Sequence, residues 1–259
     1  MPLKTNLKNL TPSRVQYSRE IHLLSGGYSC PTAFPEGKIT IYPWDSQVAD
    51  WIIEQRKKAT SPREITRGLI SQLVNLNGAK IEKFVLGDVS TVLMVSRAIA
   101  RENKVEFESS CPVCGHVHHE SLSIPDSLEM VGKKEPGYAG YDDVTLPICK
   151  DVVRIRPLLI EDELNMSQRD ANEGLGWVKG LSDHMAAIIW PIVTVGGEKP
   201  DNMKELVTWF RALPPRDQEY LEIQELELTP HLDQRVKMTC DQCAHKYVYP
   251  LSIDDDFFR

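Results

Sequence analysis

The sequence predicts an α+β protein made of two related halves that meet at a pair of β-hairpins. Three observations lead to this expectation. The chain has two CxxC motifs, Cys111-Cys114 and Cys240-Cys243. The residues around the first motif align with those around the second without a gap. Helix start signals and short strand-like segments precede both motifs in the same order, so each half should contain strands and helices.

The repeat is clearest when Cys111 is placed over Cys240, an offset of 129 residues. The segment VEFESSCPVCGHVHHESLSIPD then lies over QRVKMTCDQCAHKYVYPLSIDD, and upstream Asp88 falls on Asp217. Residues beside both CxxC motifs alternate with a period of two, which is typical of β-strands. Each motif is therefore predicted to be a strand, a turn that carries two thiols, and a returning strand.

Two such hairpins that face one another form a zinc ribbon, in which four thiolates surround one zinc ion. The predicted metal ligands are Cys111, Cys114, Cys240 and Cys243. Paired CxxC motifs in a cytoplasmic chain of this size favour a metal over disulfides. The spacing alone does not separate zinc from iron. A closed shell of four thiolates leaves no position for water or substrate, so we expect the zinc to be structural.

The other features of the two turns receive simpler interpretations. Because four cysteines complete the shell, His116, His118, His119 and His245 are interpreted as hairpin or surface residues. Gly115 suits a left-handed turn after the first pair. Ala244 stands at the equivalent position, which predicts a less strict second turn.

Composition and charge limit the classes of function. The chain has 259 residues, 41% hydrophobic and 26% charged, which is typical of a globular protein. No apolar run approaches the roughly 18 residues of a membrane-spanning helix. The polar start MPLKTNLKNLTPSR lacks the apolar core of a secretory signal, so we expect a cytoplasmic chain. The net charge of −7 argues against generic binding to nucleic acid, which relies on many Lys and Arg contacts.

The domain organisation is predicted from the repeat and from breaks in the pattern. We expect an N-terminal arm (1–21), a first α+β lobe (22–128) with the knuckle 111–114, a linker (129–143) and a second lobe (144–259) with the knuckle 240–243 and a C-terminal tail. The linker rests on the glycines, proline and mixed charge of EMVGKKEPGYAGYDD. In the first lobe Ser61 and Glu64 form a capping-box pattern, and Asp88 opens a helix. In the second lobe Pro191 should end a helix.

The order of motifs resembles the T4-type baseplate protein family of tailed bacteriophages. The resemblance rests on LLSGGYSCPTAFPEGKITIYPW, on GDVSTVLMVSRAIARENKVEFESSCPVCG and on VTLPICKDVVRIRPLLIEDE, and covers roughly residues 22–165. The family usually has Arg where this chain has Val89, and Arg-Pro where it has Tyr42-Pro43. The resemblance implies a baseplate hub subunit or hub assembly protein, with other phage tail and baseplate proteins as partners. Its place would be the host cytoplasm during assembly, and the virion's tail baseplate if it stays in the finished particle.

No catalytic constellation stands out in the sequence, and we expect neither an enzyme nor a small-molecule substrate. The acidic run Glu161-Asp162-Glu163 is interpreted as a helix start favoured by the helix dipole. Trp177, Phe257 and Phe258 are the candidate partner-binding residues. An alternative function is that of a zinc-ribbon protein that binds nucleic acid or is linked to transcription, through Lys237, Lys246, Tyr247 and Tyr249. A metalloenzyme would require an open ligand position on the metal.

Overall fold

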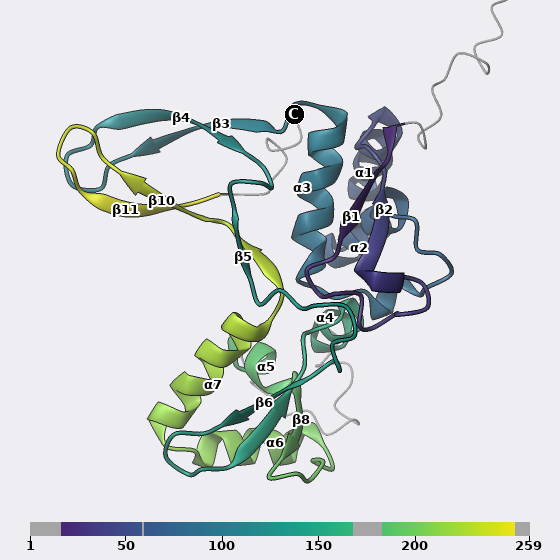
Figure 1. Cartoon of the computed structure of the whole chain (residues 1–259), viewed down its shortest axis with the longest axis vertical. Helices are drawn as coiled ribbons and strands as arrows, with labels where there is room; N and C mark the ends of the chain where they lie inside the picture. The colour runs from purple at the N-terminus through teal and green to yellow at the C-terminus, as the bar shows by residue number, and fades with distance from the viewer. Residues whose placement is uncertain (1–16, 59, 168–182, 252–259) are drawn as a thin grey trace, which may run out of the picture.

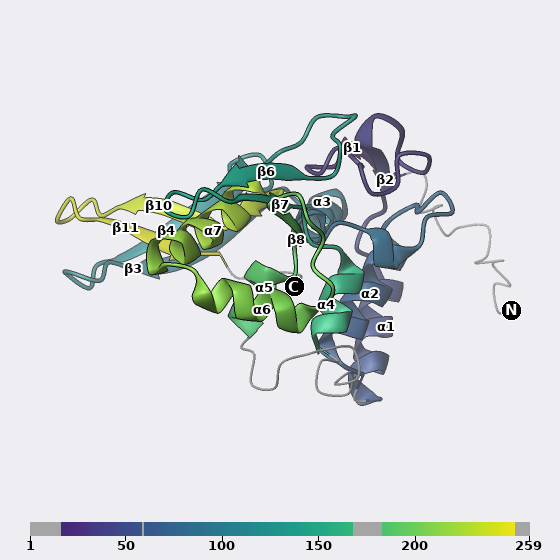
Figure 2. The ribbon, with the colours of Figure 1, turned by 90° about the horizontal axis from the view of Figure 1, so that it is seen from below.

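The computed structural model describes residues 17–58, 60–167 and 183–251. In this part of the chain, two lobes are stacked along the long axis, and an arm of two β-hairpins projects to one side (Figure 1). A view turned by 90° shows the hairpins on one side of the molecule and the first two helices on the other (Figure 2). No helix among these residues is long and apolar enough to span a membrane.

The first lobe combines a small hairpin with three helices. Strand β1 (Arg19–His22) pairs antiparallel with β2 (Lys38–Ile41), and the helices are α1 (Ser46–Lys57), α2 (Pro62–Leu73) and α3 (Asp88–Ala100). Two short 3₁₀ turns, η3 (Pro35–Gly37) and η4 (Ile81–Lys83), complete it. The apolar faces of these strands and helices enclose a core that includes Ile41, Ile70 and Val92.

Local capping explains where α1 and α2 begin. The Asp45 carboxylate accepts a hydrogen bond from the Val48 N–H at 3.0 Å. Ser61 and Glu64 bond reciprocally with each other's backbone N–H groups, and this confirms the predicted capping box. Such contacts satisfy N–H groups that have no partner inside the first helical turn.

The second lobe combines a three-stranded antiparallel sheet with four helices. The sheet order is β6 (Asp142–Thr145), β7 (Val152–Ile155) and β8 (Ile192–Val195). The helices are α4 (Ile160–Ser167), α5 (Asp183–Ile189), α6 (Met203–Ala212) and α7 (Pro215–Leu228). As expected, α5 ends just before Pro191, which cannot donate a backbone hydrogen bond. The chain then turns into β8, a strand absent from the expected elements.

The arm consists of two separate antiparallel hairpins, as the sequence predicts. One is formed by β3 (Lys104–Ser110) and β4 (Val117–Ser123), the other by β10 (Arg235–Thr239) and β11 (Lys246–Pro250). A small core at the base of the arm draws on both halves of the chain. Its buried members are Leu24, Met94, Val105, Ile124, Leu128, Leu232 and Leu251.

The segment 129–143, which we expected to be a linker, contains regular structure. It begins with β5 (Glu129–Val131), which pairs antiparallel with β9 (His231–Asp233), and its last two residues belong to β6. Between them, the Lys134 N–H donates to the Leu24 carbonyl at 2.7 Å, and the Tyr138 ring packs edge-on against Tyr28. The segment therefore joins the halves through fixed contacts.

A second joint connects the lobes directly beside η4. The Leu86 N–H donates to the Leu158 carbonyl at 2.8 Å, and the Ile160 N–H donates to the Phe84 carbonyl at 2.9 Å. Ile160, at the start of α4, is buried in the core of the first lobe. The two lobes are thus held together at places well away from the CxxC turns.

Candidate metal centre

The two hairpins bring all four predicted cysteine ligands together at the tip of the arm. Cys111 Sγ lies 3.7 Å from Cys243 Sγ, and Cys114 Sγ lies 3.6 Å from Cys240 Sγ. All four sulfur atoms lie within 4.8 Å of one another. A tetrahedron with metal–sulfur bonds of about 2.3 Å has sulfur–sulfur edges of about 3.8 Å. The spacing therefore fits four thiolates around one ion, and is far longer than a disulfide bond of about 2 Å.

The two turns share one backbone design. In the first, the Cys111 N–H donates to the His116 carbonyl, and the Gly115 N–H donates to the Cys111 carbonyl, both at 2.9 Å. In the second, the same bonds join Cys240 with His245 and Ala244 with Cys240, both at 2.8 Å. In both turns the first cysteine is buried and the second is exposed.

Ala244 corrects the expectation of a less strict second turn. Its φ is 59°, and that of Gly115 is 73°, so both residues adopt the left-handed conformation. A Cβ atom makes this conformation unfavourable by roughly 1–2 kcal/mol. The second turn therefore requires the same left-handed conformation as the first, although alanine adopts this conformation less readily than glycine.

Because the four thiols lie close together, ionisation of one opposes ionisation of the others. Burial opposes ionisation of Cys240, but the Cys243 N–H, the His118 ring and the Gln242 N–H together lower its pKa to about 6. The His245 N–H lowers the pKa of Cys243, but burial and the other three sulfur side chains raise it above its ordinary value. A divalent cation would remove this conflict, because it favours all four thiolates at once.

Side-chain contacts continue from the metal centre toward the base of the arm. Ser109 Oγ and Tyr247 Oη are 3.0 Å apart. Further along, the rings of Phe107 and Tyr249 stack with centroids 4.7 Å apart. These contacts hold β3 against β11, two strands that belong to different hairpins.

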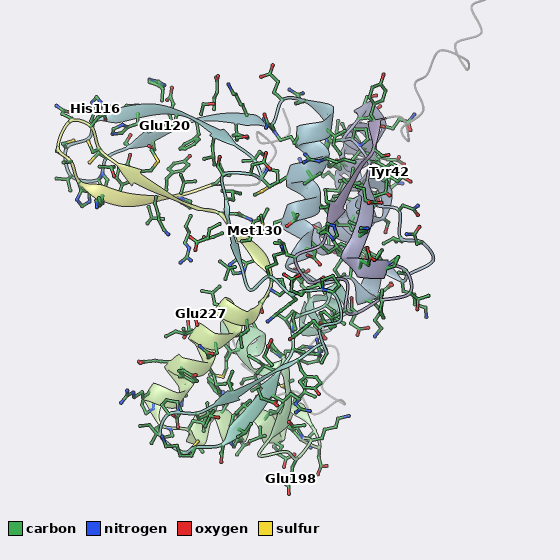
Figure 3. All side chains as sticks on the ribbon, viewed as in Figure 1. Tyr42, His116, Glu120, Met130, Glu198 and Glu227 are labelled. Carbon is green, nitrogen blue, oxygen red and sulfur yellow. The ribbon has the colours of Figure 1, made fainter. Side chains whose placement is uncertain are left out.

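The histidines near the turns have different environments. Figure 3 shows His116 at the far end of the arm. The His119 side chain is 74% exposed and lies 3.0 Å from a Glu108 carboxylate oxygen, which fits the predicted surface position. His118 lies within the hairpin, on β4, rather than at its surface: only 6% of this residue is exposed and its Nδ1 lies 2.8 Å from Asp241 Oδ1. The offset of 129 places His118 over the inward-facing Tyr247, and this was the signal in the sequence for its burial.

The acidic run at the start of α4 includes one residue with more contacts than a helix start requires. Asp162 is 3% exposed and accepts two hydrogen bonds from the Arg156 guanidinium, at 2.6 and 2.8 Å. It also accepts from the Leu159 N–H at 2.7 Å and from Trp190 Nε1 at 2.6 Å. Both carboxylate oxygens are satisfied by these donors, so Asp162 joins α4 to the residues that directly follow β7 and α5.

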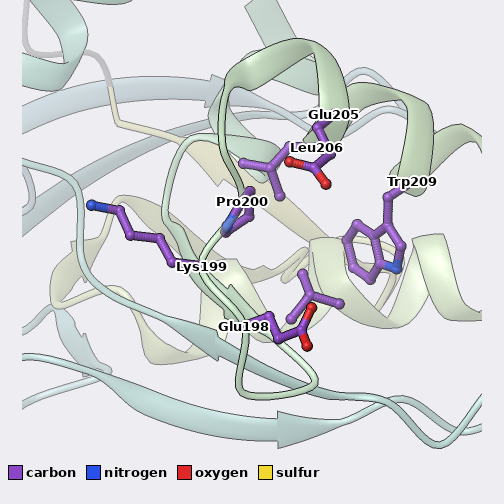
Figure 4. A pocket seen from close by; sticks show the side chains of 7 residues that line it. Glu198, Lys199, Pro200, Glu205, Leu206 and Trp209 are labelled. Atoms are coloured by element: carbon purple, nitrogen blue, oxygen red, sulfur yellow. The ribbon is translucent and has the colours of Figure 1, made fainter.

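A shallow hollow on the second lobe does not bring its charged side chains together into a binding site. It lies between the loop after β8 and α6, and Figure 4 shows Lys199 pointing away from Glu198 and Glu205. The Glu205 carboxylate accepts a hydrogen bond from the Asp201 N–H at 2.7 Å and so serves the start of α6. The residues that line the hollow are Val195, Glu198, Lys199, Pro200, Glu205, Leu206 and Trp209.

The remaining candidate residues are either occupied by contacts within the chain or lie outside the described residues. Lys237 lies 3.1 Å from a Glu129 carboxylate oxygen, and Tyr247 and Tyr249 face β3. Trp177, Phe257 and Phe258 lie outside the described residues. The only site that the structure assembles from the predicted residues, within its described part, is therefore the four-cysteine cluster.

Comparison with known families identifies the broader class. The sequence matches the family described as T4 bacteriophage base plate protein over residues 34–259, which includes both CxxC turns, most of the first lobe and the second lobe. The chain belongs to the T4 bacteriophage base plate protein family. This match confirms the resemblance found in the sequence and extends it through the second lobe. No curated protein and no solved structure matches the chain. Membership in this family indicates a structural component of a phage tail baseplate.

Proposed function

We propose that this baseplate family protein acts in the hub region of a contractile tail, as a structural or assembly component that docks to other tail proteins. A zinc ion bound by Cys111, Cys114, Cys240 and Cys243 would hold its arm in shape. The observation that carries the proposal is the four-sulfur cluster, contributed equally by two hairpins that are distant in sequence.

Zinc is the ion best suited to this cluster. It prefers four tetrahedral ligands, and thiolates are common in its structural sites. Zinc also has no redox chemistry, so the oxidation state of the bound ion does not change with the redox conditions around the arm. Four protein ligands leave the ion no open position, which supports docking rather than substrate turnover as the mode of action.

Exposed apolar side chains on the arm support a docking role. Val113 in the first turn is 66% exposed, and Val248 on β11 is 56% exposed. A partner that covers such apolar side chains removes them from water, which favours docking. Trp177, Phe257 and Phe258 remain proposed partner-binding residues from the sequence.

We also propose that the two lobes arose by internal duplication. The equivalent residues Asp88 and Asp217 support this, because both are fully buried and both accept backbone N–H groups from an upstream loop. Asp88 accepts from Ser25 at 3.2 Å, and Asp217 accepts from Ile148 at 2.7 Å and Cys149 at 3.0 Å. The matching turns at the tip of the arm provide independent support.

Metal analysis of the purified full-length chain tests the proposed site. We expect one zinc ion per chain, which Cys114→Ser or Cys243→Ser should remove together with a fall in melting temperature. These thiols are exposed, so serine should fit without a steric effect. Cys149→Ser is the matched control because Cys149 is exposed and lies outside the cluster. A chain without metal would overturn the site, and iron with visible thiolate absorption would overturn the choice of zinc.

Complementation tests the role in assembly. A phage mutant that lacks this chain should form no complete baseplates by electron microscopy, and the wild-type chain supplied in trans should restore them. Cross-linking during infection should join the chain to hub proteins. Normal tails in the mutant would contradict an assembly role, and cross-links confined to the baseplate periphery would contradict the hub.

A further inference from the structure

The outer face of α7 is acidic around an apolar centre. Leu221 is buried in the core of the second lobe, whereas Ile223 and Leu226 are 51% and 48% exposed. A helix turns once every 3.6 residues, so residues three and four apart share one face. The exposed residues of this face, which we call the α7 stripe, are Glu219, Glu222, Ile223, Leu226 and Glu227. The stripe is suited to a partner that offers apolar and basic groups.

The outer face of the second hairpin has the opposite charge around its own apolar residue. Tyr247 and Tyr249 face β3, so Lys246 and Val248 point to the other side of β11. Lys237 stands opposite Val248 in the register of β10 and β11, and its side chain is 79% exposed. Val248 is 56% exposed, and neither strand contains an acidic residue. We call Lys237, Lys246 and Val248 the basic face of the arm.

Two cations of this hairpin have partners within the chain. Arg235 makes two hydrogen bonds to Asp233, at 2.8 and 2.9 Å, and only 11% of the Asp233 side chain is exposed. Arg235 is therefore left out of the basic face. Lys237 lies 3.1 Å from Glu129, but both side chains are mostly exposed. Such an exposed ion pair contributes little to stability, so Lys237 can exchange it for another.

The two faces are similar in length and lie on the same side of the molecule. The 14 residues of α7 span about 21 Å, and the five residues of β10 or β11 span about 17 Å. The arm and α7 both lie away from α1 and α2, and β10 and β11 form the edge of the arm nearer to the second lobe (Figures 1 and 2). Both faces are exposed, so they do not cover one another within one chain.

We propose that a second copy of this chain covers both faces, in a two-fold dimer in which the α7 stripe of each copy packs on the basic face of the other. The chain carries both members of a complementary pair, and a two-fold interface brings the same two surfaces together twice. Because both faces lie on one side, a single contact can form both pairs. Val248 of one copy would meet Ile223 and Leu226 of the other, with lysines and glutamates paired around them.

This dimer adds a partner that the proposed function does not name, and it relies on that function only for the metal that holds the arm in shape. Two other occupants of the faces make different predictions. If the arm folded onto α7 of its own chain, the contact would not depend on protein concentration. If a different tail protein covered the faces, the purified chain would remain a monomer.

Sedimentation of the purified full-length chain over a range of concentrations tests the dimer. The arm variant Lys237→Glu/Lys246→Glu reverses the charge of the basic face. The α7 variant Glu222→Lys/Glu227→Lys reverses that of the α7 stripe. Each variant is measured alone and in an equimolar mixture with the other.

Two further variants complete the test. Ile223→Ser/Leu226→Ser removes the apolar centre of the α7 stripe, and it should leave the monomer folded because both side chains are about half exposed. Lys57→Glu/Lys58→Glu is the matched control for charge, because it makes the same change on exposed lysines at the end of α1.

Wild type should form a dimer that weakens between about 0.1 M and about 1 M salt, where the screening length falls from about 10 Å to about 3 Å. Each charge-reversed variant should raise the dissociation constant by about 100-fold or more, because like charges then face one another in both pairs. The mixture of the two should restore the dimer, because each supplies the charge that the other lacks. Ile223→Ser/Leu226→Ser should weaken the dimer, and the control should match wild type.

A wild-type monomer at all concentrations would overturn the dimer, as would charge-reversed variants that associate like wild type or a mixture that stays monomeric. If the arm variant fails to fold, the α7 variant and Ile223→Ser/Leu226→Ser still decide the question. Metal content of the same samples separates this result from the proposed function. A monomer overturns the dimer whether or not it binds zinc, whereas a lack of zinc overturns the proposed metal site.

Discussion

Two buried aspartates that the offset of 129 residues places over one another, Asp88 and Asp217, have pKa values shifted in opposite directions. Burial raises the pKa of Asp88 from 3.8 to about 6, although hydrogen bonds from Ser25 and Leu24 oppose the rise. One of its oxygens, Oδ2, is buried and has no partner among the described residues. Burial also acts against ionised Asp217, but the Cys149 and Ile148 N–H groups outweigh it and lower its pKa. The N–H groups that face Asp217 lie closer to its carboxylate, at 2.7 and 3.0 Å, than the Ser25 N–H lies to that of Asp88, at 3.2 Å.

Asp88 should therefore make the protein less stable as the pH rises. Above the unfolded pKa, the unfolded chain loses this proton while the folded chain keeps it, so the free energy of unfolding falls until the pH passes about 6. A rise of about two pKa units corresponds to about 3 kcal/mol, of which about 1 kcal/mol falls between pH 5 and 7. Asp88→Asn should lack this fall. Urea unfolding of both proteins at pH 5 and pH 7 measures it.

Asp217→Asn provides the contrasting measurement. A lowered folded pKa stabilises the protein above the unfolded pKa, and this contribution is lost as the pH falls through the folded pKa. The substitution should therefore be costly at neutral pH and less so under acid conditions. Stability profiles of Asp88→Asn and wild type that run parallel would contradict the assigned role of Asp88.

At the scale of elements, the start of α3 depends on a glycine for space. Gly87 has an ordinary helical φ of −65°, so its conformation does not require glycine. A Cβ atom there would lie 1.6 Å from the Pro230 carbonyl oxygen, next to β9. This close approach lets α3 from the first half lie against β9 from the second.

Gly87→Ala should therefore destabilise the protein by about 3 kcal/mol or more, because backbone atoms must move apart. Gly115→Ala is the matched control, since a Cβ there meets no atom within 4 Å and only its φ of 73° is unfavourable. That substitution should cost about 1 kcal/mol. Urea unfolding gives both values. Equal losses would show that contact with Pro230 is not the reason for the glycine.

The elements that could be predicted are those specified by nearby residues. Ser61 and Glu64 cap α2 from within its first turn, and the alternation around each CxxC motif specifies both hairpins. The pairing of β5 with β9 could not be predicted, because each has three residues and the partners are far apart in sequence. The burial of Asp162 was missed for the same reason, because its partner Trp190 lies far from it in the sequence. That of His118 was missed although the offset of 129 residues places it over Tyr247.

For the whole molecule, the four cysteines were predicted correctly as a cluster, but they are not the sole link between the halves. The β5–β9 pair, the backbone bonds between residues 84–86 and 158–160, and the Tyr28–Pro157 hydrogen bond at 3.2 Å all cross between them. These links lie in or beside the lobes, and they do not involve the cysteines. Metal binding and lobe association should therefore be separable.

The arm should depend on the proposed metal far more than the lobes do. Each of its hairpins has two strands, and isolated two-stranded hairpins are marginally stable in water. After removal of the metal, Ser109–Tyr247, Phe107–Tyr249 and the contacts of His118 with Asp241 and Tyr247 still join the hairpins along the arm, and the small core holds only its base. Amide hydrogen exchange with and without a chelator measures this difference directly.

We expect the fastest gain in exchange at the turns near Cys111 and Cys240, with a smaller gain toward Val105 and Leu251 at the base. Amides of α3 and α7 should keep their protection, because their side chains pack in the lobe cores. Cys149→Ser with its metal bound should match wild type. Loss of protection in the lobes together with the arm would show that the metal, rather than the contacts beside η4 and β5, holds the two halves in place.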